Sequence, residues 1–338
     1  MSIGAPRAIP CTTARRGRRS RSESRRRVVS VQSLGLVDGR QLSLRRWGDG
    51  PQPVVILHGL LDSAEGWTRL AEGISAPCIA VDLPGFGRSD PSPHGSVSGY
   101  ARDVADVLEM LGIERFTLVG HSLGGAVAAA LVELIPSRVS SLVLLAPAGF
   151  GRIPLAEAAS LPGVRNLVQA SLPLVLSSRR AVTAGFVKMV TNGETPDEQV
   201  VERVTKRAGD LVAGAREGTR AVVKAGRRAD AFHRRRIAYD GPVFAVWGDH
   251  DRLVPVAHRH GVKRAFPHAR IQVWYGVGHH PLTERFDDLL TLVTNASTAA
   301  RRPVRRKAAK PVMAAMTASN NNGVSTLAGE RPRIHSSA

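Results

Sequence analysis

Three short segments of this sequence contain the residue types that carry out nucleophilic catalysis. A serine hydroxyl is a poor nucleophile at neutral pH, so it requires a neighbouring base that removes its proton. Histidine serves as such a base when a carboxylate fixes its tautomer and stabilises its charged form. The candidates are Ser122 as nucleophile, His279 or His280 as base, and Asp249 or Asp251 as acid.

The residues around Ser122 predict a very tight turn. They form the motif GHSLGG at 120–125, which follows an expected strand at 116–119 and precedes an alanine-rich helical run. This is the strand–turn–helix setting in which a G-x-S-x-G motif presents a nucleophile. We expect strained backbone at Ser122, with Gly120 and Gly124 removing side chains that would collide. The serine would then lie beside the positive end of the helix.

The candidate bases lie in the segment GVGHHP at 276–281, just after the last expected strand. Glycines in this segment permit a loop that reaches over the nucleophile. Pro281 predicts the start of a helix, which makes His280 a packing residue at that helix's N-terminus. We therefore favour His279 as the base.

The candidate acids follow an expected strand at 243–247. Asp249 and Asp251 both lie on the loop at the edge of the sheet where Ser122 is expected. The aspartate that does not act as the acid is expected to brace this loop. The chain order serine, aspartate, histidine is one of the orders in which such catalytic triads occur.

An ester or amide carbonyl attacked by serine becomes an oxyanion that requires hydrogen-bond donors. We predict the backbone N–H of Leu123, which follows the nucleophile, and that of Leu60, in the loop after an expected strand at 54–57. Losing one such donor typically costs about 3–4 kcal/mol of transition-state stabilisation. His58, in the same loop, is expected to pack and to form hydrogen bonds. This chemistry requires no metal ion and no organic cofactor.

Short apolar strands separated by helical segments predict the architecture that positions these residues. The pattern indicates a mostly parallel, eight-stranded sheet with helices on both faces, which is an α/β fold. The first two strands are expected around a turn at Asp38-Gly39. The expected strands are 29–36, 41–46, 54–57, 78–83, 116–119, 139–145, 243–247 and 270–274.

Between residues 147 and 240 the strand–helix alternation stops, and helical patterns replace it. They are clearest at 160–177, interrupted by Pro173, and at 195–225. We expect this segment to form a helical cap over the carboxyl edge of the sheet, where ligands of such sheets bind. The predicted domains are therefore a core of 28–146 and 241–296, a cap of 147–240, and terminal tails of 1–27 and 297–338.

The formal net charge of +19 is concentrated at the two ends of the chain. Residues 1–30 carry +8 and residues 297–338 carry +7, which leaves +4 for the body. We expect both tails to be disordered and solvated. The alternative is a protein of another class, in which the tails bind nucleic acid or an anionic membrane surface.

The two cysteines, Cys11 and Cys78, form no disulfide framework, which indicates a reducing compartment and a cytoplasmic protein. No apolar run reaches the roughly 18–20 residues that a membrane span requires. The N-terminus lacks the apolar segment of a secretory signal.

The sequence resembles the cap-bearing branch of the α/β-hydrolase fold family. The matching segments are His58-Gly59, DLPGFGRSD at 82–90, GHSLGG at 120–125, GDHDRLVP at 248–255 and Gly278-His279. The resemblance implies Asp251 as the acid and His279 as the base. Haloalkane dehalogenases and epoxide hydrolases of this family have aspartate in place of Ser122. Carbon–carbon bond hydrolases usually have asparagine in place of His121 and tryptophan in place of His280.

The function expected is hydrolysis of a carboxylic ester through an acyl-enzyme. The apolar stretch at 161–176 suggests a small-molecule substrate with an apolar acyl or alcohol group. Acyl transfer, thioester cleavage and carbon–carbon cleavage are alternatives, because one fold hosts all of these reactions. The cap contains many basic residues, and most of them are expected on a solvated outer face; they include Arg203, Lys206, Arg207, Arg234, Arg235 and Arg236. The oligomeric state is left open.

Overall fold

The computed structural model describes residues 29–36, 38–93, 95–206, 208–227 and 231–301. The tail predicted at 1–27 and the part of the other tail beyond Arg301 lie outside these residues. The second tail was expected to begin at 297, but the last helix, α11 (Phe286–Arg301), continues through that position. No helix in the described ranges combines the length and apolarity needed to cross a membrane.

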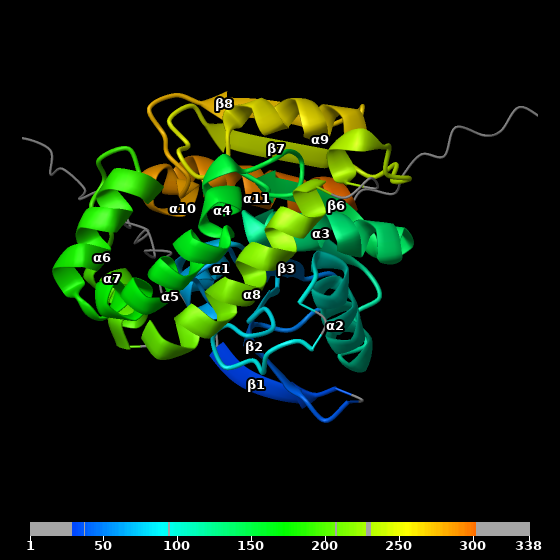
Figure 1. Ribbon diagram of the computed structural model, residues 1–338. Coiled ribbons are helices and arrows are strands. Elements are labelled where there is room, and N and C mark those ends of the chain that lie inside the picture. Colours follow the sequence, from blue (N-terminus) through cyan, green and yellow to red (C-terminus); the bar gives the residue numbers. More distant parts are fainter. Residues whose placement is uncertain (1–28, 37, 94, 207, 228–230, 302–338) are drawn as a thin grey trace, which may run out of the picture. The chain divides into compact units, whose positions relative to one another are not determined.

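The strands form one eight-stranded sheet, which confirms the predicted fold class (Figure 1). Its order is β1-β2-β4-β3-β5-β6-β7-β8. β2 pairs antiparallel with both β1 and β4, and all other neighbours are parallel. The strands are β1 Val29–Gly35, β2 Gln41–Trp47, β3 Val54–Leu57, β4 Cys78–Val81, β5 Phe116–His121, β6 Val139–Leu145, β7 Val243–Gly248 and β8 Arg270–Trp274.

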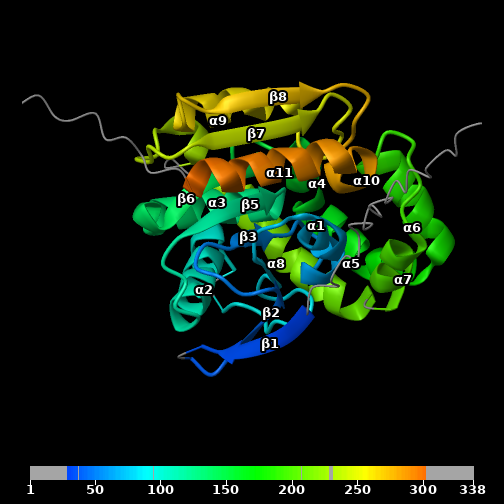
Figure 2. The same ribbon diagram turned by 180° about the vertical axis from the view of Figure 1, so that it is seen from behind.

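The two faces of the sheet have separate hydrophobic cores, because successive side chains of a strand point to opposite faces. In β3, Val55 and Leu57 pack with α2 (Val97–Met110), α3 (Leu123–Leu134) and α9 (Arg259–Ala265). The alternate side chains of the same strand pack with α1 (Thr68–Gly73) and α11. In the view from behind, α1 and α11 lie in front of the strands (Figure 2).

The segment between β6 and β7, residues 147–240, is mainly helical and is called the insert below (Figure 1). Pro173 lies inside α5, where an interruption was expected. Leu172 and Leu176 on either side of it pack into the hydrophobic core, and this tertiary packing outweighs the local cost of proline. The insert contains α4 Pro154–Ala159, α5 Pro162–Ser177, α6 Arg179–Gly185, η3 Phe186–Val190, α7 Glu198–Lys206, α8 Ala208–Arg227 and η4 Phe232–Arg234.

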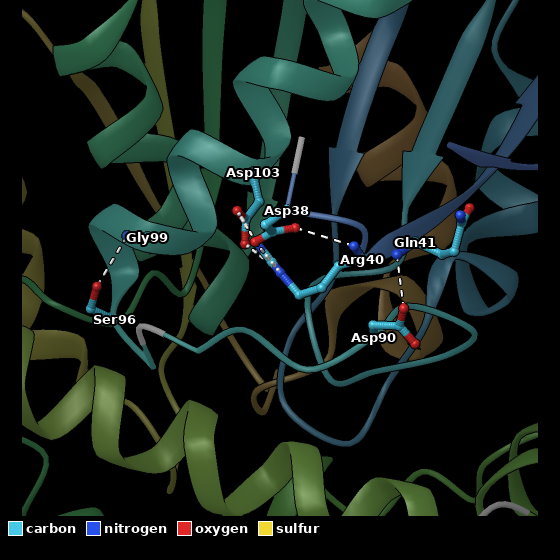
Figure 3. Close-up of polar contacts among 7 residues, drawn as sticks. All are labelled: Asp38, Arg40, Gln41, Asp90, Ser96, Gly99 and Asp103. Atoms are coloured by element: carbon cyan, nitrogen blue, oxygen red, sulfur yellow. Dashed lines mark hydrogen bonds and ion pairs between the residues drawn. The ribbon is translucent and has the colours of Figure 1, made fainter. Parts of the chain in front are cut away.

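A buried ion pair joins the β1–β2 turn to α2 (Figure 3). The Arg40 guanidinium donates to both carboxylate oxygens of Asp103, at 3.0 and 2.7 Å, and also to Asp38 at 2.7 Å. The Asp103 side chain is only 7% exposed, so breaking this pair would leave a buried charge without its partner. The ion pair holds the β1–β2 hairpin, which forms one edge of the sheet, against α2.

The remaining short helices connect the strands and complete the element list. They are η1 Ala64–Trp67, η2 Pro136–Arg138, η5 Val256–His258 and α10 Pro281–Glu284.

Candidate active site

The three predicted catalytic residues follow the carboxyl ends of three parallel strands. Ser122 follows β5, Asp251 lies on the loop after β7, and His279 lies on the loop after β8. The strand order places β6 between β5 and β7, so the loops leave one edge of the sheet side by side. This is the edge at which open α/β sheets bind their ligands.

Ser122 has the strained backbone that the glycine pattern predicted. Its φ of 52° and ψ of −115° lie outside the conformations that residues with a side chain ordinarily adopt. In the described ranges, the other non-glycine residues with positive φ are Leu61 and Ala146, which follow β3 and β6. Strained residues thus cluster at the carboxyl edge of the central strands, as is common at functional sites.

The glycines around Ser122 permit unusually close backbone approach. A Cβ atom at Gly120 would lie 2.5 Å from the carbonyl oxygen of Gly124. A Cβ atom at Gly124 would overlap the carbonyl oxygens of Leu57 and His58, and neither backbone atom can rotate away. Gly120 is therefore needed to bring β5 close to α3, and Gly124 to bring α3 close to the end of β3.

We expect Gly124→Ala to destabilise the folded chain by about 3 kcal/mol or more, because the clash forces backbone apart. Gly185→Ala is the matched control. Gly185 has a helical φ of −63° and nothing lies within 4 Å of its added Cβ, so a gain of about 0.5–1 kcal/mol is expected. Urea unfolding of the two variants measures the difference, and equal stabilities would refute this account of the turn.

Asp251 and His279 form a buried hydrogen-bonded pair. The Nδ1 of His279 lies 2.7 Å from Oδ2 of Asp251, and the two side chains are 5% and 0% exposed. Oδ1 of Asp251 accepts the backbone N–H groups of Leu253 and Val254, at 2.9 and 2.8 Å. The carboxylate therefore accepts at both oxygens, and it holds Nδ1 protonated, leaving Nε2 of His279 available as an acceptor.

The alternative residues of both loops have structural contacts instead. Oδ1 of Asp249 accepts the N–H groups of Gly276 and Val277, at 2.8 and 3.3 Å, so it braces the histidine loop as expected of the second aspartate. His280 precedes α10, and its Nδ1 lies 2.9 Å from Oγ1 of Thr283.

His121 connects the serine turn to the histidine loop. Its Nε2–H donates to the backbone carbonyl of His279 at 2.8 Å, and the two rings lie 4.8 Å apart between centroids. Asp251 therefore contacts His279 directly. Ser122 is linked to this pair through its neighbour His121, which is hydrogen-bonded to the backbone of His279. The catalytic pairing of Ser122 with His279 stays a prediction. Sequence analysis missed the role of His121, although its place beside the serine was a usable signal.

Two buried histidines beside His279, His121 and His280, have lowered pKa values. Burial, together with His279 and His280, holds the pKa of His121 well below its usual value. Burial also lowers the pKa of His280 to about 4. These lowered values favour neutral His121 and His280 rings beside His279 at neutral pH.

The predicted oxyanion donors lie under α8 of the insert. A Cβ atom at Gly218 would lie 2.5 Å from Cδ2 of Leu60 and 3.0 Å from Cδ2 of Leu123. Within the described residues neither backbone N–H has a protein acceptor, which suits donors that await a ligand. Their catalytic role stays a prediction. His58 is structural: its Nε2 accepts the N–H of Leu83 at 3.0 Å, and its Nδ1–H donates to the Gly59 carbonyl.

The insert also holds the histidine loop in place, which sequence analysis did not anticipate. The N–H of His279 donates to the carbonyl of Val190 at 2.6 Å. Glu284 accepts the N–H groups of both Gly278 and Asn192, at 2.9 and 2.7 Å. Arg252, beside Asp251, donates to the carbonyl of Lys188. These long-range contacts have no local pattern by which a sequence could reveal them.

Two of the basic residues expected on a solvated outer face instead contact the core. The Arg203 side chain is 17% exposed and lies 4.0 Å from Asp62, which accepts from the Trp67 indole. Arg235 donates to both oxygens of Glu133 on α3. The expectation concerned most basic residues of the insert, and these two are exceptions to it, because ion pairs across the insert–core contact are invisible in one sequence. Among the described residues no group of histidine, cysteine and carboxylate side chains is arranged to hold a metal ion.

Comparison with known proteins adds an independent observation. A family model described as alpha/beta hydrolase fold matches residues 52–286. An uncharacterized protein of Mycobacterium tuberculosis is 33% identical over 271 residues, covering 75% of this chain and 78% of that protein. The dihydrolipoyllysine-residue acetyltransferase component of an acetoin cleaving system from Cupriavidus necator is 30% identical, covering 76% of this chain and 66% of that protein. The crystal structure of an esterase from a Rhodococcus species matches with a TM-score of 0.62 at 25% identity, covering 80% of this chain and 98% of the esterase.

Proposed function

Because this chain belongs to the α/β-hydrolase family, we propose that it is a serine hydrolase that cleaves a carboxylic ester through an acyl-enzyme. The observation that carries the proposal is the buried pair of Asp251 and His279 on the loops beside the strained Ser122. The pair leaves Nε2 of His279 as the only ring nitrogen able to accept a proton.

In the first half of the reaction, Oγ of Ser122 attacks the ester carbonyl carbon while Nε2 of His279 takes the hydroxyl proton. The carbonyl electrons move onto oxygen, and the N–H groups of Leu60 and Leu123 stabilise this oxyanion. When the carbon–oxygen bond to the alcohol breaks, the leaving oxygen takes the proton from His279. Ser122 is then acylated.

In the second half, water replaces the alcohol. His279 removes a proton from water, and the resulting hydroxide attacks the acyl carbon and displaces Oγ of Ser122. Asp251 stays ionised and stabilises the imidazolium in both halves. The same proton returns to Ser122, and the carboxylic acid leaves.

The insert acts as a cap in this proposal. Two contacts support a position of the insert over the site. Gly218 of the insert lies against Leu60 and Leu123, and the carbonyl of Val190 accepts the N–H of His279. The substrate proposed is a small-molecule ester with an apolar acyl or alcohol group. Acyl transfer is the second candidate, favoured by the likeness to the Cupriavidus acetyltransferase component.

A series of p-nitrophenyl esters of increasing acyl length, measured alongside an acyl thioester, tests this proposal. We expect kcat/KM to rise at least about tenfold from the acetyl to the octanoyl ester, because added methylenes bury apolar surface. A marked preference for the thioester, with acyl transfer to an added thiol, would favour the second candidate. No turnover of any acyl compound would refute the proposed function.

A further inference from the structure

The insert exposes an unusual amount of large apolar surface along one helix. Among the described residues, eleven large hydrophobic side chains are exposed, and seven of them lie between positions 155 and 175. Leu174 is 76% exposed and Leu167 is 70% exposed. Six of the seven belong to α5 and the residue before it, and we call these the α5 stripe: Leu161, Val164, Leu167, Val168, Leu174 and Val175.

The spacing of the α5 stripe places its members on one side of the helix. At the helical repeat of 3.6 residues per turn, the six members fall within an arc of about 140°, which is a single broad face of the helix. Leu172 and Leu176 border this stripe, and they pack into the core of the molecule. The members of the stripe are instead 37–76% exposed, so they are not the side chains by which α5 is held, and a cluster of exposed apolar side chains marks an interaction surface.

Charge identifies the kind of surface that the stripe fits. The insert has sixteen Arg and Lys residues against nine Asp and Glu residues, while the rest of the body between residues 31 and 296 carries a net −3. Residues 158–193, which include α5 and α6, contain no acidic residue and four basic ones. Two of these, Arg179 and Arg180, lie just after α5 and are exposed, and Arg179 also pairs with Glu198 of α7 at 2.8 Å.

We propose that the α5 stripe docks on an anionic lipid surface, so that the substrate is an ester carried by a lipid. Apolar side chains on one helical face, in a segment that contains basic and no acidic residues, match the interfacial surface of a bilayer with anionic headgroups. α5 packs on α8, and α8 contacts Leu60 and Leu123 beside Ser122. A docked stripe therefore brings the candidate site close to the lipid. The statement about substrate rests on the proposed function, whereas the docking does not.

Vesicle sedimentation of the full chain tests the docking. The vesicles contain roughly seven parts phosphatidylcholine to three parts phosphatidylglycerol, with pure phosphatidylcholine for comparison. Salt at about 0.5 M NaCl screens the basic tails, so that the binding that remains reports apolar contact. At about 0.15 M NaCl we expect the wild type to bind the anionic vesicles more tightly, and at about 0.5 M NaCl we expect measurable binding to remain.

Leu167→Gln with Leu174→Gln removes apolar surface without changing charge, and we expect it to weaken vesicle binding by about tenfold or more. Met110→Gln with Leu134→Gln is the matched control. These side chains are 49% and 47% exposed at the ends of α2 and α3, outside the insert, so binding should stay within about twofold of wild type.

Equal binding by the two double variants would overturn the inference, as would failure of the wild type to bind anionic vesicles. A wild-type dimer that becomes monomeric only in Leu167→Gln with Leu174→Gln would assign the stripe to contact between two copies, and would also overturn it. Ser122→Ala should sediment with vesicles like the wild type. Loss of its fluorophosphonate labelling therefore tests the catalytic proposal separately from the docking.

Discussion

Ser122→Ala is expected to abolish covalent labelling by a serine-directed fluorophosphonate and to lower kcat for a p-nitrophenyl ester by roughly 10⁶-fold. The reagent and the ester both require the Ser122 oxygen, because each forms a bond to it. Alanine keeps the Cβ and adds no volume beside Gly59, whose nearest neighbours include Cβ of Ser122. The fold should therefore persist while the nucleophile is lost.

Ser141→Ala controls for the loss of a buried serine elsewhere in the sheet. Ser141 lies on β6, is fully buried, and its hydroxyl has no hydrogen-bond partner among the described residues. Removing this hydroxyl should leave labelling and turnover unchanged, since no polar partner is orphaned. Undiminished labelling of Ser122→Ala would mean that another residue is the nucleophile, and the catalytic proposal would be abandoned.

Asp251→Asn is expected to lower kcat by about 10⁴-fold through the wrong tautomer of His279. Oδ1 of Asp251 accepts two backbone N–H groups, so the asparagine oxygen takes that position and its amide nitrogen faces the imidazole. Nδ1 of His279 must then accept, and the ring proton moves to Nε2. An Nε2–H cannot take the proton of Ser122.

Asp249→Asn separates this effect from general damage to the loops. Its Oδ1 accepts from Gly276 and Val277, and an asparagine oxygen can replace it, so a fall of less than about tenfold is expected. Fluorophosphonate labelling rates and thermal melting of both variants complete the measurement. A near-normal rate in Asp251→Asn together with a large loss in Asp249→Asn would transfer the acid role to Asp249.

Local patterns in the sequence were sufficient for most of the framework. All eight strands and the strained turn were predicted from three local features. These are the two-residue repeat of side chains along a strand, the helical repeat, and the glycines around Ser122. These features depend on neighbours within a few residues, where steric limits act directly. The same reasoning failed at Pro173 because packing of the adjacent leucines outweighed the local preference of proline.

Local patterns therefore predict the elements and the strand ends from which the serine, aspartate and histidine project. The long-range packing of the chain was needed to establish that Asp251, rather than Asp249, contacts His279, and that Nε2–H of His121 and the carbonyl of Val190 hold the histidine loop. His121 and His279 are 158 residues apart. A hydrogen bond across that separation depends on how sheet, loops and insert pack, and it leaves no periodic signal in the chain.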